Sequence, residues 1–328
     1  MSNTEVTGLG ALNIDHLYHI ESILEDGEVV VKEERLFPGG SAANTIYGLA
    51  RLGVKTGFVG VIGDDTEGKI LVEDFEKAGV DTSQIKVKAG ARSGAVLCLT
   101  DSSGKRSLYV SPGANNLLTI EDLDMSSINK AGVLHVSSFT DNRQFETLVG
   151  MMENIEPSTK LSFSPGALYA ARGLKALAPI LKRTYVLFLN QNEIRQLTVQ
   201  DVVDGAGTCL REGCQMVVVT LGRGTEVASS KGNGQKTNAV CYIRDTENEY
   251  IIEPTSRKSA GEIETTGAGD AFAAGFLYGL LKGKNPEECG RLGNIVAQFS
   301  IAEMGARSGL PDPEELSRRY REIYNREL

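Results

Sequence analysis

The chain of 328 residues contains no tryptophan, only three histidines and only five cysteines. The histidines, at positions 16, 19 and 135, are too scattered to predict a histidine-based metal centre. The cysteines are odd in number and form no CxxC pair, which argues against a disulfide framework and against a zinc site. These scarcities are typical of a protein of the reducing cytosol, so we expect a cytoplasmic location.

Long apolar runs and basic clusters are also missing. No run reaches the roughly 18 residues of a transmembrane helix, and the amino terminus lacks the basic and apolar segments of a signal peptide. The net charge is −9 and no block of Lys and Arg occurs, which argues against nucleic acid as a partner. The remaining composition, 41% hydrophobic and 23% charged, is that of an ordinary globular protein.

Short apolar runs alternate with helical patterns along most of the chain. The runs "TGFVGVIG", "GVLHVSS", "TKLSFSP", "TYVLFLN" and "QMVVVTL" are β-branched, are bounded by turn residues and predict buried strands. Helices are predicted at roughly 66–78, 142–154, 170–182 and 199–212. The alternation predicts an α/β fold with a mostly parallel sheet covered on both faces. Ligands on such sheets usually bind at the carboxyl ends of the strands.

Residues 16–37 and about 93–111 break this alternation. Both segments mix apolar and charged residues, and "DSSGK" predicts a hairpin turn. We expect a small β-layer that projects from the main sheet, either as an edge hairpin or as a lid. A lid is favoured because the two segments flank the glycine-rich stretch at 39–44. No Pro/Gly/Ser-rich linker divides the chain, so residues 1–328 are expected to form a single domain.

The stretch "IETTGAGDAFAAGF", residues 263–276, places two glycines and an aspartate at the start of an apolar helix. Gly267 and Gly269 allow the backbone to approach a ligand closely. The first N–H groups of a helix have no partner within it and can hold an anion. Asp270, itself an anion, lies in this opening. It is either a functional carboxylate or simply a helix N-cap.

A second stretch, "FPGGSAANTIYGLARLG" at 37–53, follows a polar cluster. Gly39 and Gly40 permit an unusual turn, and Asn44 offers both a donor and an acceptor at the helix start. Asn13 and Asp15 follow the first predicted strand. Such groups suit a vicinal diol, although Asp15 could cap a turn and Asn44 could fill a helix.

Two further strand ends carry polar residues. In "VLFLNQNEIRQL", Asn190 and Glu193 supply oxygen atoms that suit Mg²⁺ and its waters, although a helix-capping pair explains them equally well. In "VVVTLGRGTEVAS", a strand is expected to end at Thr220, and Gly222 and Gly224 allow a turn before another strand. That turn could pass beneath a nucleotide or be only a tight connection.

These motifs occur in the order and approximate spacing found in the PfkB carbohydrate kinases, the ribokinase-like family, which the chain resembles over nearly its whole length. The resemblance implies a three-layer α/β/α sandwich with a small β-lid that can also mediate a homodimer. It implies ATP as the phosphate donor and Asp270 as the catalytic base. The other implied roles are an anion hole (Gly267, Ala268 and Gly269), a Mg²⁺ site with its waters (Asn190 and Glu193), a nucleotide site (Thr220, Gly222, Gly224 and Asn294) and a sugar site (Asp15, Gly39, Gly40 and Asn44).

The sequence departs from the family pattern at three positions. Glu264 stands where the motif usually has Asp, a position that some members use around a monovalent cation, so the longer side chain leaves that cation an open question. Ser41 replaces the lysine of ribokinases proper, and Ser164 stands where many members have Asp. The fold is expected to tolerate these changes, whereas ribose as the acceptor is less well supported.

The first expectation for function is therefore an ATP-dependent kinase of a small free sugar. The alternative within the family is a nucleoside kinase, whose base could pack against an apolar lid with Tyr18, Phe37, Leu97 and Tyr109. Arg106 could instead contact the phosphate of a phosphosugar. A non-catalytic sugar or nucleotide sensor is disfavoured by the retained Asp270, and a Rossmann dehydrogenase by the missing early G-x-G-x-x-G.

Overall fold

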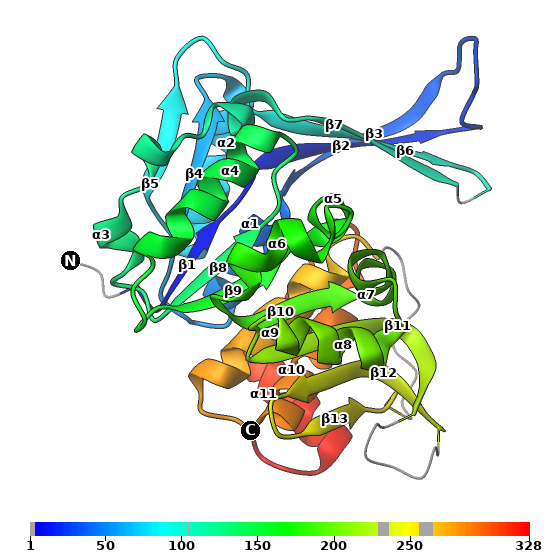
Figure 1. Cartoon of the computed structure of the whole chain (residues 1–328). Coiled ribbons are helices and arrows are strands. Elements are labelled where there is room, and N and C mark those ends of the chain that lie inside the picture. The colour runs from blue at the N-terminus through cyan, green and yellow to red at the C-terminus, as the bar shows by residue number, and fades with distance from the viewer. Residues whose placement is uncertain (1–3, 104, 229–235, 256–264) are drawn as a thin grey trace.

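The computed structural model describes residues 4–103, 105–228, 236–255 and 265–328. A nine-stranded sheet lies between two layers of helices, and a four-stranded sheet projects from it (Figure 1). This arrangement confirms the predicted α/β/α sandwich and its mostly parallel sheet.

The nine-stranded sheet has the order β13-β12-β11-β10-β9-β8-β1-β4-β5. Pairing is parallel from β5 to β11, whereas β12 and β13 are antiparallel additions at one edge. The strands are β1 (Val6–Leu9), β4 (Thr56–Gly63), β5 (Asp81–Lys88), β8 (Val133–Ser137), β9 (Lys160–Ser164), β10 (Thr184–Asn190), β11 (Met216–Ala228), β12 (Lys236–Asp245) and β13 (Glu249–Ile252).

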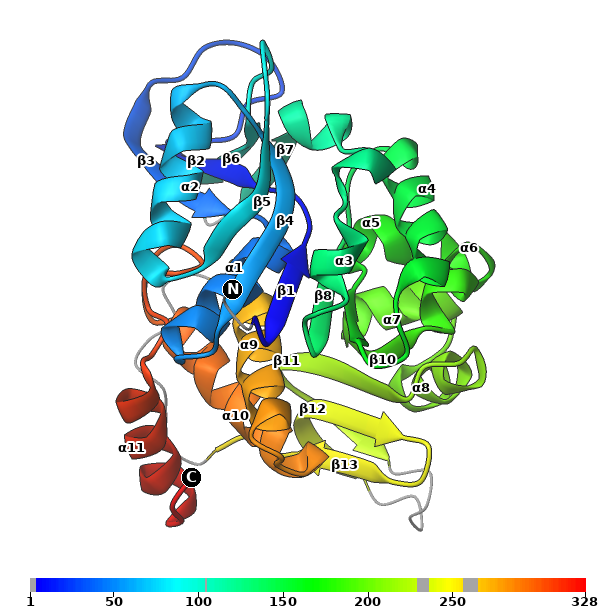
Figure 2. The same cartoon turned by 90° about the vertical axis from the view of Figure 1, so that its left-hand side faces the viewer.

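Each face of this sheet is covered by its own set of helices (Figure 2). One hydrophobic core packs against α1 (Ser41–Arg51), α2 (Thr66–Ala78), α9 (Ala268–Leu281), α10 (Pro286–Ser300) and α11 (Pro313–Tyr324). The other packs against α3 (Met125–Ile128), α4 (Asn142–Met151), α5 (Gly166–Ala170), α6 (Gly173–Leu181), α7 (Gln191–Thr198) and α8 (Val202–Arg211). Short 3₁₀ turns lie at η1 (Gly113–Leu117), η2 (Ile120–Asp122) and η3 (Met152–Asn154).

The predicted helices are present, and local signals set their ends. Helix α2 has the predicted bounds because the Asp65 side chain accepts a hydrogen bond from the Gly68 N–H and Gly79 ends the helix at φ +81°. The helices predicted at 170–182 and 199–212 are shorter in the structure. Gly173, at φ +77°, separates α6 from α5, and Asp201 caps α8, so that helix begins at Val202 rather than at 199.

The projecting sheet has the order β3-β2-β6-β7 and corresponds to the expected β-layer. Its strands are β2 (Asn13–Ile20), β3 (Val31–Gly39), β6 (Gly94–Asp101) and β7 (Arg106–Ser111). The expected extended segment 16–37 is thus two strands, and its residues 21–30 lie outside both. The antiparallel pairing of β6 with β7 confirms the hairpin predicted around 101–105. We call this sheet the lid sheet.

Candidate active site

The predicted site residues gather where parallel strands end and two helices begin. Strand β1 runs into β2, which carries Asp15, and helices α1 and α9 start at Ser41 and Ala268. Thr220 and Gly222 of β11 line one cavity together with Ala268 and Gly269 at the start of α9, so a parallel strand and a helix start meet here, as they do where α/β sheets usually bind ligands.

Asp270 occupies the third position of α9, not its cap. The N-cap is Gly267, which has φ +76°, and a Cβ atom there would lie 2.4 Å from Ala306 Cβ. Only glycine fits this conformation and this close approach without strain. The alternative interpretation of Asp270 as an N-cap is therefore wrong, and its side chain is available for other partners.

The Asp270 carboxylate is held by two side chains from the start of α1. Ser41 Oγ donates to Oδ1 at 2.7 Å, and Asn44 Nδ2 donates to Oδ2 at 2.9 Å. Burial nevertheless raises the pKa of Asp270 to about 6, although both hydrogen bonds and the Arg307 charge lower it. A carboxyl group with this pKa takes up and releases a proton close to neutral pH.

The predicted anion hole lies at the first turn of α9. The Ala268 N–H forms a turn hydrogen bond to the Thr265 carbonyl at 3.3 Å, and Gly267 is the cap. A Cβ atom on Gly269 would have open space around it, so a ligand can approach the backbone here. The positive end of the helix dipole favours a negative group at this point.

The predicted sugar-site residues also come together. A Cβ atom on Gly39 would lie 2.5 Å from Asp15 Oδ2, so the absence of a side chain at Gly39 leaves room for this carboxylate. Gly40 has φ +103°, and a Cβ there would lie 2.1 Å from the Ala11 carbonyl oxygen. This turn brings the end of β3 against the β1–β2 connection and directs α1 into the site.

Two of the predicted sugar ligands are already engaged by protein groups. Asn13 is buried, and its Oδ1 accepts a hydrogen bond from Asn115 Nδ2 at 2.9 Å. Asn44 donates to Asp270 and accepts from Arg307 Nε at 2.9 Å. The structure therefore places Asn44 against the candidate base, and its contact with a sugar remains a prediction.

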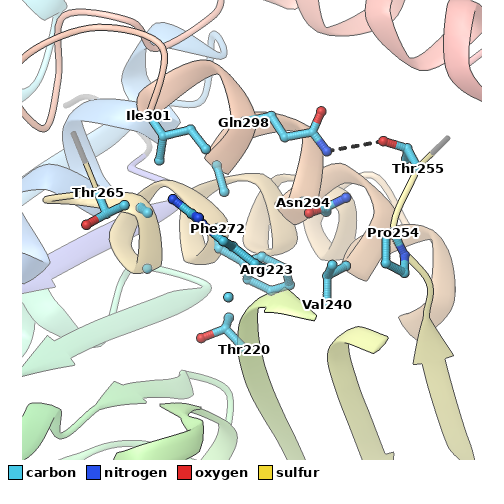
Figure 3. A pocket seen from close by; sticks show the side chains of 14 residues that line it. Thr220, Arg223, Val240, Pro254, Thr255, Thr265, Phe272, Asn294, Gln298 and Ile301 are labelled. Carbon is cyan, nitrogen blue, oxygen red and sulfur yellow. Dashed lines mark hydrogen bonds between the residues drawn. The ribbon is translucent and has the colours of Figure 1, made fainter. Parts of the chain in front are cut away.

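A cavity of about 410 Å³ adjoins the start of α9 (Figure 3). Its lining includes three of the predicted nucleotide residues (Thr220, Gly222 and Asn294), together with Ala268 and Gly269. The cavity thus joins the predicted nucleotide site to the predicted anion hole.

The strand beside this cavity differs from the expectation. Strand β11 does not end at Thr220 but continues to Ala228, with a shift in its pairing to β12 between Thr220 and Thr225. Gly222 and Gly224, at φ +59° and +117°, lie in this irregular stretch. Gly222 lines the cavity, whereas Gly224 packs closely against Asn238. The glycines therefore form a bulge within one strand.

Asn190 and Glu193 form a capping box at the start of α7, the helix-capping pair expected from the sequence as the alternative to a Mg²⁺ site. Asn190 Oδ1 accepts from the N–H groups of Asn192 and Glu193, and Glu193 Oε2 accepts from the Asn190 N–H at 2.8 Å. Burial raises the pKa of Glu193, and the Glu193 charge in turn raises the pKa of Asp270. Glu193 thus lies near the candidate base, and a single carboxylate that acts through water fits Mg²⁺.

Several lining residues were not predicted from the sequence. Arg223, Phe272, Thr255 and Gln298 also line the cavity, and the Gln298 amide donates to Thr255 at 3.5 Å (Figure 3). Arg307 and Asn115 were missed as well. Arg307 and Asn115 are isolated polar residues whose roles depend on contacts with residues far away in the sequence, so no local sequence pattern marks them. Glu264, the position linked to a monovalent cation, lies outside the described residues.

The described helices include none that is both long and apolar enough to cross a membrane.

Comparisons with known proteins agree with this geometry. Residues 3–313 match the model of the pfkB family carbohydrate kinases. An uncharacterized sugar kinase of Archaeoglobus fulgidus is 40% identical over 264 residues, which cover 80% of this chain and 98% of the relative. A nucleoside kinase of Methanothermobacter thermautotrophicus is 26% identical, over 94% of this chain and 96% of its own length.

Among solved structures, the ribokinase of Thermotoga maritima superimposes with a TM-score of 0.80 at 27% identity. The match covers 95% of this chain and 98% of that structure. The similarity therefore extends over the sheet, both helix layers and the lid sheet together.

Proposed function

The chain belongs to the pfkB family of carbohydrate kinases, and from that premise we propose that it transfers the γ-phosphoryl group of ATP to a hydroxyl of a small free sugar. The observation that supports this most directly is the Asp270 carboxylate. Two α1 side chains orient it beside the start of α9, and its pKa is raised to about 6. A base of this kind accepts a proton from a hydroxyl near neutral pH.

The proposed mechanism assigns one task to each part of the site. The cavity beside Thr220, Gly222 and Asn294 holds ATP, with its γ-phosphate at the first turn of α9. Backbone N–H groups at Gly267, Ala268 and Gly269 stabilise the negative charge of the transferred group. Asp270 takes the proton from the attacking hydroxyl, and Glu193 would hold Mg²⁺ through water. When bound, Mg²⁺ neutralises charge on the phosphates.

The acceptor lies between Asp270 and the lid sheet in this proposal. The register places two charged side chains, Asp15 and Arg35, on one face of the lid sheet. The apolar side chains of this face are Phe37, Val96, Val110, Leu17, Cys98 and Leu108. This mixed face supports a sugar, which needs polar contacts and little room. A nucleoside needs a flat apolar slot for its base, because an unstacked base loses roughly 1–3 kcal/mol.

We also propose that the chain forms a homodimer through the opposite face of the lid sheet. One cross-strand row on this face contains His16 and the apolar residues Leu36, Leu97 and Tyr109. The three apolar side chains are between 38% and 55% exposed. A row of exposed apolar side chains is typical of an interaction surface. Substitutions of Tyr109 on this face and of Val110 on the opposite face test this proposal.

A substrate panel tests the acceptor and the base together. We expect ATP-dependent ADP release with at least one small sugar, and the Asp270→Asn variant to lose about 10²–10⁴-fold in kcat while still binding ATP. Calorimetry of sugars and nucleosides with a non-hydrolysable ATP analogue ranks the acceptors. A nucleoside that binds tenfold more tightly than every sugar would replace the sugar in this proposal. Near-normal turnover by Asp270→Asn would remove Asp270 as the base.

A further inference from the structure

Arg307 is a buried cation that connects three elements, two of which belong to the active site. It lies in the connection between α10 and α11 and is 7% exposed. Its Nε donates to Asn44 Oδ1 at 2.9 Å, its Nη2 donates to the Gly39 carbonyl at 3.2 Å, and its Nη1 donates to Asp74 Oδ2. These partners lie on α1, at the end of lid strand β3 and on α2.

Two aromatic rings pack against this guanidinium. Its central carbon lies 5.1 Å from the ring centroid of Tyr47 and 5.1 Å from that of Phe75. The Asp74 carboxylate supplies the opposite charge that a buried guanidinium requires. The side chain is therefore held from several sides, and its donors point in defined directions.

The hydrogen-bonding chemistry of Arg307 determines the orientation of the Asn44 amide. A guanidinium can only donate, so the Asn44 atom that faces Nε must be the oxygen. The amide nitrogen then faces the other way, towards Asp270 Oδ2 at 2.9 Å. The flipped amide would place N–H against N–H on one side and oxygen against carboxylate on the other. Both hydrogen bonds would then be lost.

We propose that Arg307 is a positioning residue that fixes the Asn44 amide and, through it, the Asp270 carboxylate. The inference rests on the proposed role of Asp270 as the base. Through the Gly39 carbonyl, the same guanidinium also anchors the turn at Gly40, from which α1 enters the site. One side chain near the carboxyl end thereby orders both the base and the helix that holds it.

Lysine cannot replace arginine in this role. An ammonium group is a point charge, whereas the planar guanidinium presents donors in a fixed fork to several partners at once. Arg307→Lys therefore keeps the charge but removes the geometry, and Arg307→Met removes both. A second cavity, of about 270 Å³, is lined by both Arg307 and Arg51. Arg51 is exposed, which makes Arg51→Met a matched control.

The test compares kcat, both KM values and the pH profile of these variants. We expect Arg307→Lys to lower kcat by about 10–100-fold, because a misplaced catalytic group costs rate, with little change in the KM for ATP. The charged groups that act on Asp270 are Arg307, which lowers its pKa, and Glu193, which raises it. Arg307→Met should therefore also move the acid limb of kcat/KM to higher pH. Arg307→Lys should leave the pH of the acid limb unchanged. Arg51→Met should change neither kcat nor the pH of the acid limb.

A double-substitution cycle separates positioning from general stability. If Arg307 acts through Asn44, adding Arg307→Lys to Asn44→Ala should cost little further kcat. Losses that multiply, or a fully active Arg307→Lys, would overturn the inference. If the Arg307 variants do not fold by circular dichroism, Asp74→Asn carries the same cycle, because it weakens the hold on the guanidinium. A failed inference leaves Asp270→Asn inactive, whereas a failed function leaves it active.

Discussion

At the scale of single residues, Asp270 is balanced between opposing influences. Burial and the nearby Glu193 carboxylate raise its pKa, whereas Asn44, Ser41 and Arg307 lower it, with the result at about 6. A more exposed carboxylate would be a weaker base, and a more deeply buried one would stay protonated at neutral pH. The three supporting side chains therefore hold a half-buried carboxyl group in a form that can act as a base near neutral pH.

This balance predicts opposite pH dependences for activity and stability. Activity requires the deprotonated carboxylate, so kcat/KM should fall as the pH drops through about 6. The folded pKa lies above the ordinary value of 3.8, so the stabilising contribution of this group is fully present below about pH 4 and is lost as the pH rises through about 6.

Rate profiles from pH 5 to 8 check the first half of this prediction. Thermal unfolding of the wild type and of Asp270→Asn over the same range checks the second, because only the wild type should lose the contribution of this group on going to high pH. A kcat/KM profile that stays flat down to pH 5 would contradict the assignment.

At the scale of elements, one face of the lid sheet is expected to bind the acceptor and the other to form the dimer. Val110 and Tyr109 are neighbours on β7 and are 50% and 55% exposed, but they point to opposite faces. We predict that Val110→Ser raises the KM for the acceptor several-fold and leaves the molecular mass unchanged. Tyr109→Ser should weaken the dimer and leave the acceptor KM near that of the wild type.

Steady-state kinetics and analytical ultracentrifugation distinguish these outcomes. A Tyr109→Ser variant that alone loses acceptor binding would place the substrate on the other face. A wild-type chain that sediments as a monomer would remove the dimer.

The fold was predictable from the sequence where one local signal decides the outcome. Strand β4 is a continuous apolar run, and α2 lies between Asp65 and Gly79, so both were found with their bounds. Strands β5, β12 and β13 carry mixed polar and apolar residues in the outer part of the sheet and were not predicted. In β3 the charged residues give no clear hydrophobic alternation, so the sequence did not predict where this strand begins.

The site was predictable only in part for a related reason. Asp270, Gly267 and Gly40 lie in compact motifs whose backbone demands are visible in the sequence. Arg307 reaches Asn44 across 263 positions of the chain, and Asn115 reaches Asn13 across 102. Such pairs arise from packing of the whole fold, and a single sequence carries no record of them.

At the scale of the whole molecule, two hydrophobic cores share one sheet. Tyr169 is buried in one core and Tyr320 in the other, and the central strands β1, β4, β8, β10 and β11 contribute side chains to both cores. Loss of the sheet would uncover both cores at once. We therefore propose that residues 1–328 fold as a single unit with the lid sheet attached.

Tryptophan reporters test this unit directly, because the chain has no tryptophan of its own. We predict that Tyr169→Trp and Tyr320→Trp report the same urea midpoint, which should coincide with the midpoint from circular dichroism. Two separate midpoints would show that the cores unfold independently.

The close packing of α1 on α9 has a consequence for the making of the protein. A Cβ atom on Gly48 of α1 would lie 2.9 Å from Ala274 Cβ of α9, and Ser41 meets Asp270 across 229 positions of the chain. On the ribosome, α1 emerges long before the helix that covers it. The apolar face of α1 is therefore not covered by α9 until most of the polypeptide has been made, and until then chaperones or collapsed neighbouring segments must cover it. A nascent chain stalled before α9 would present this uncovered face to solvent.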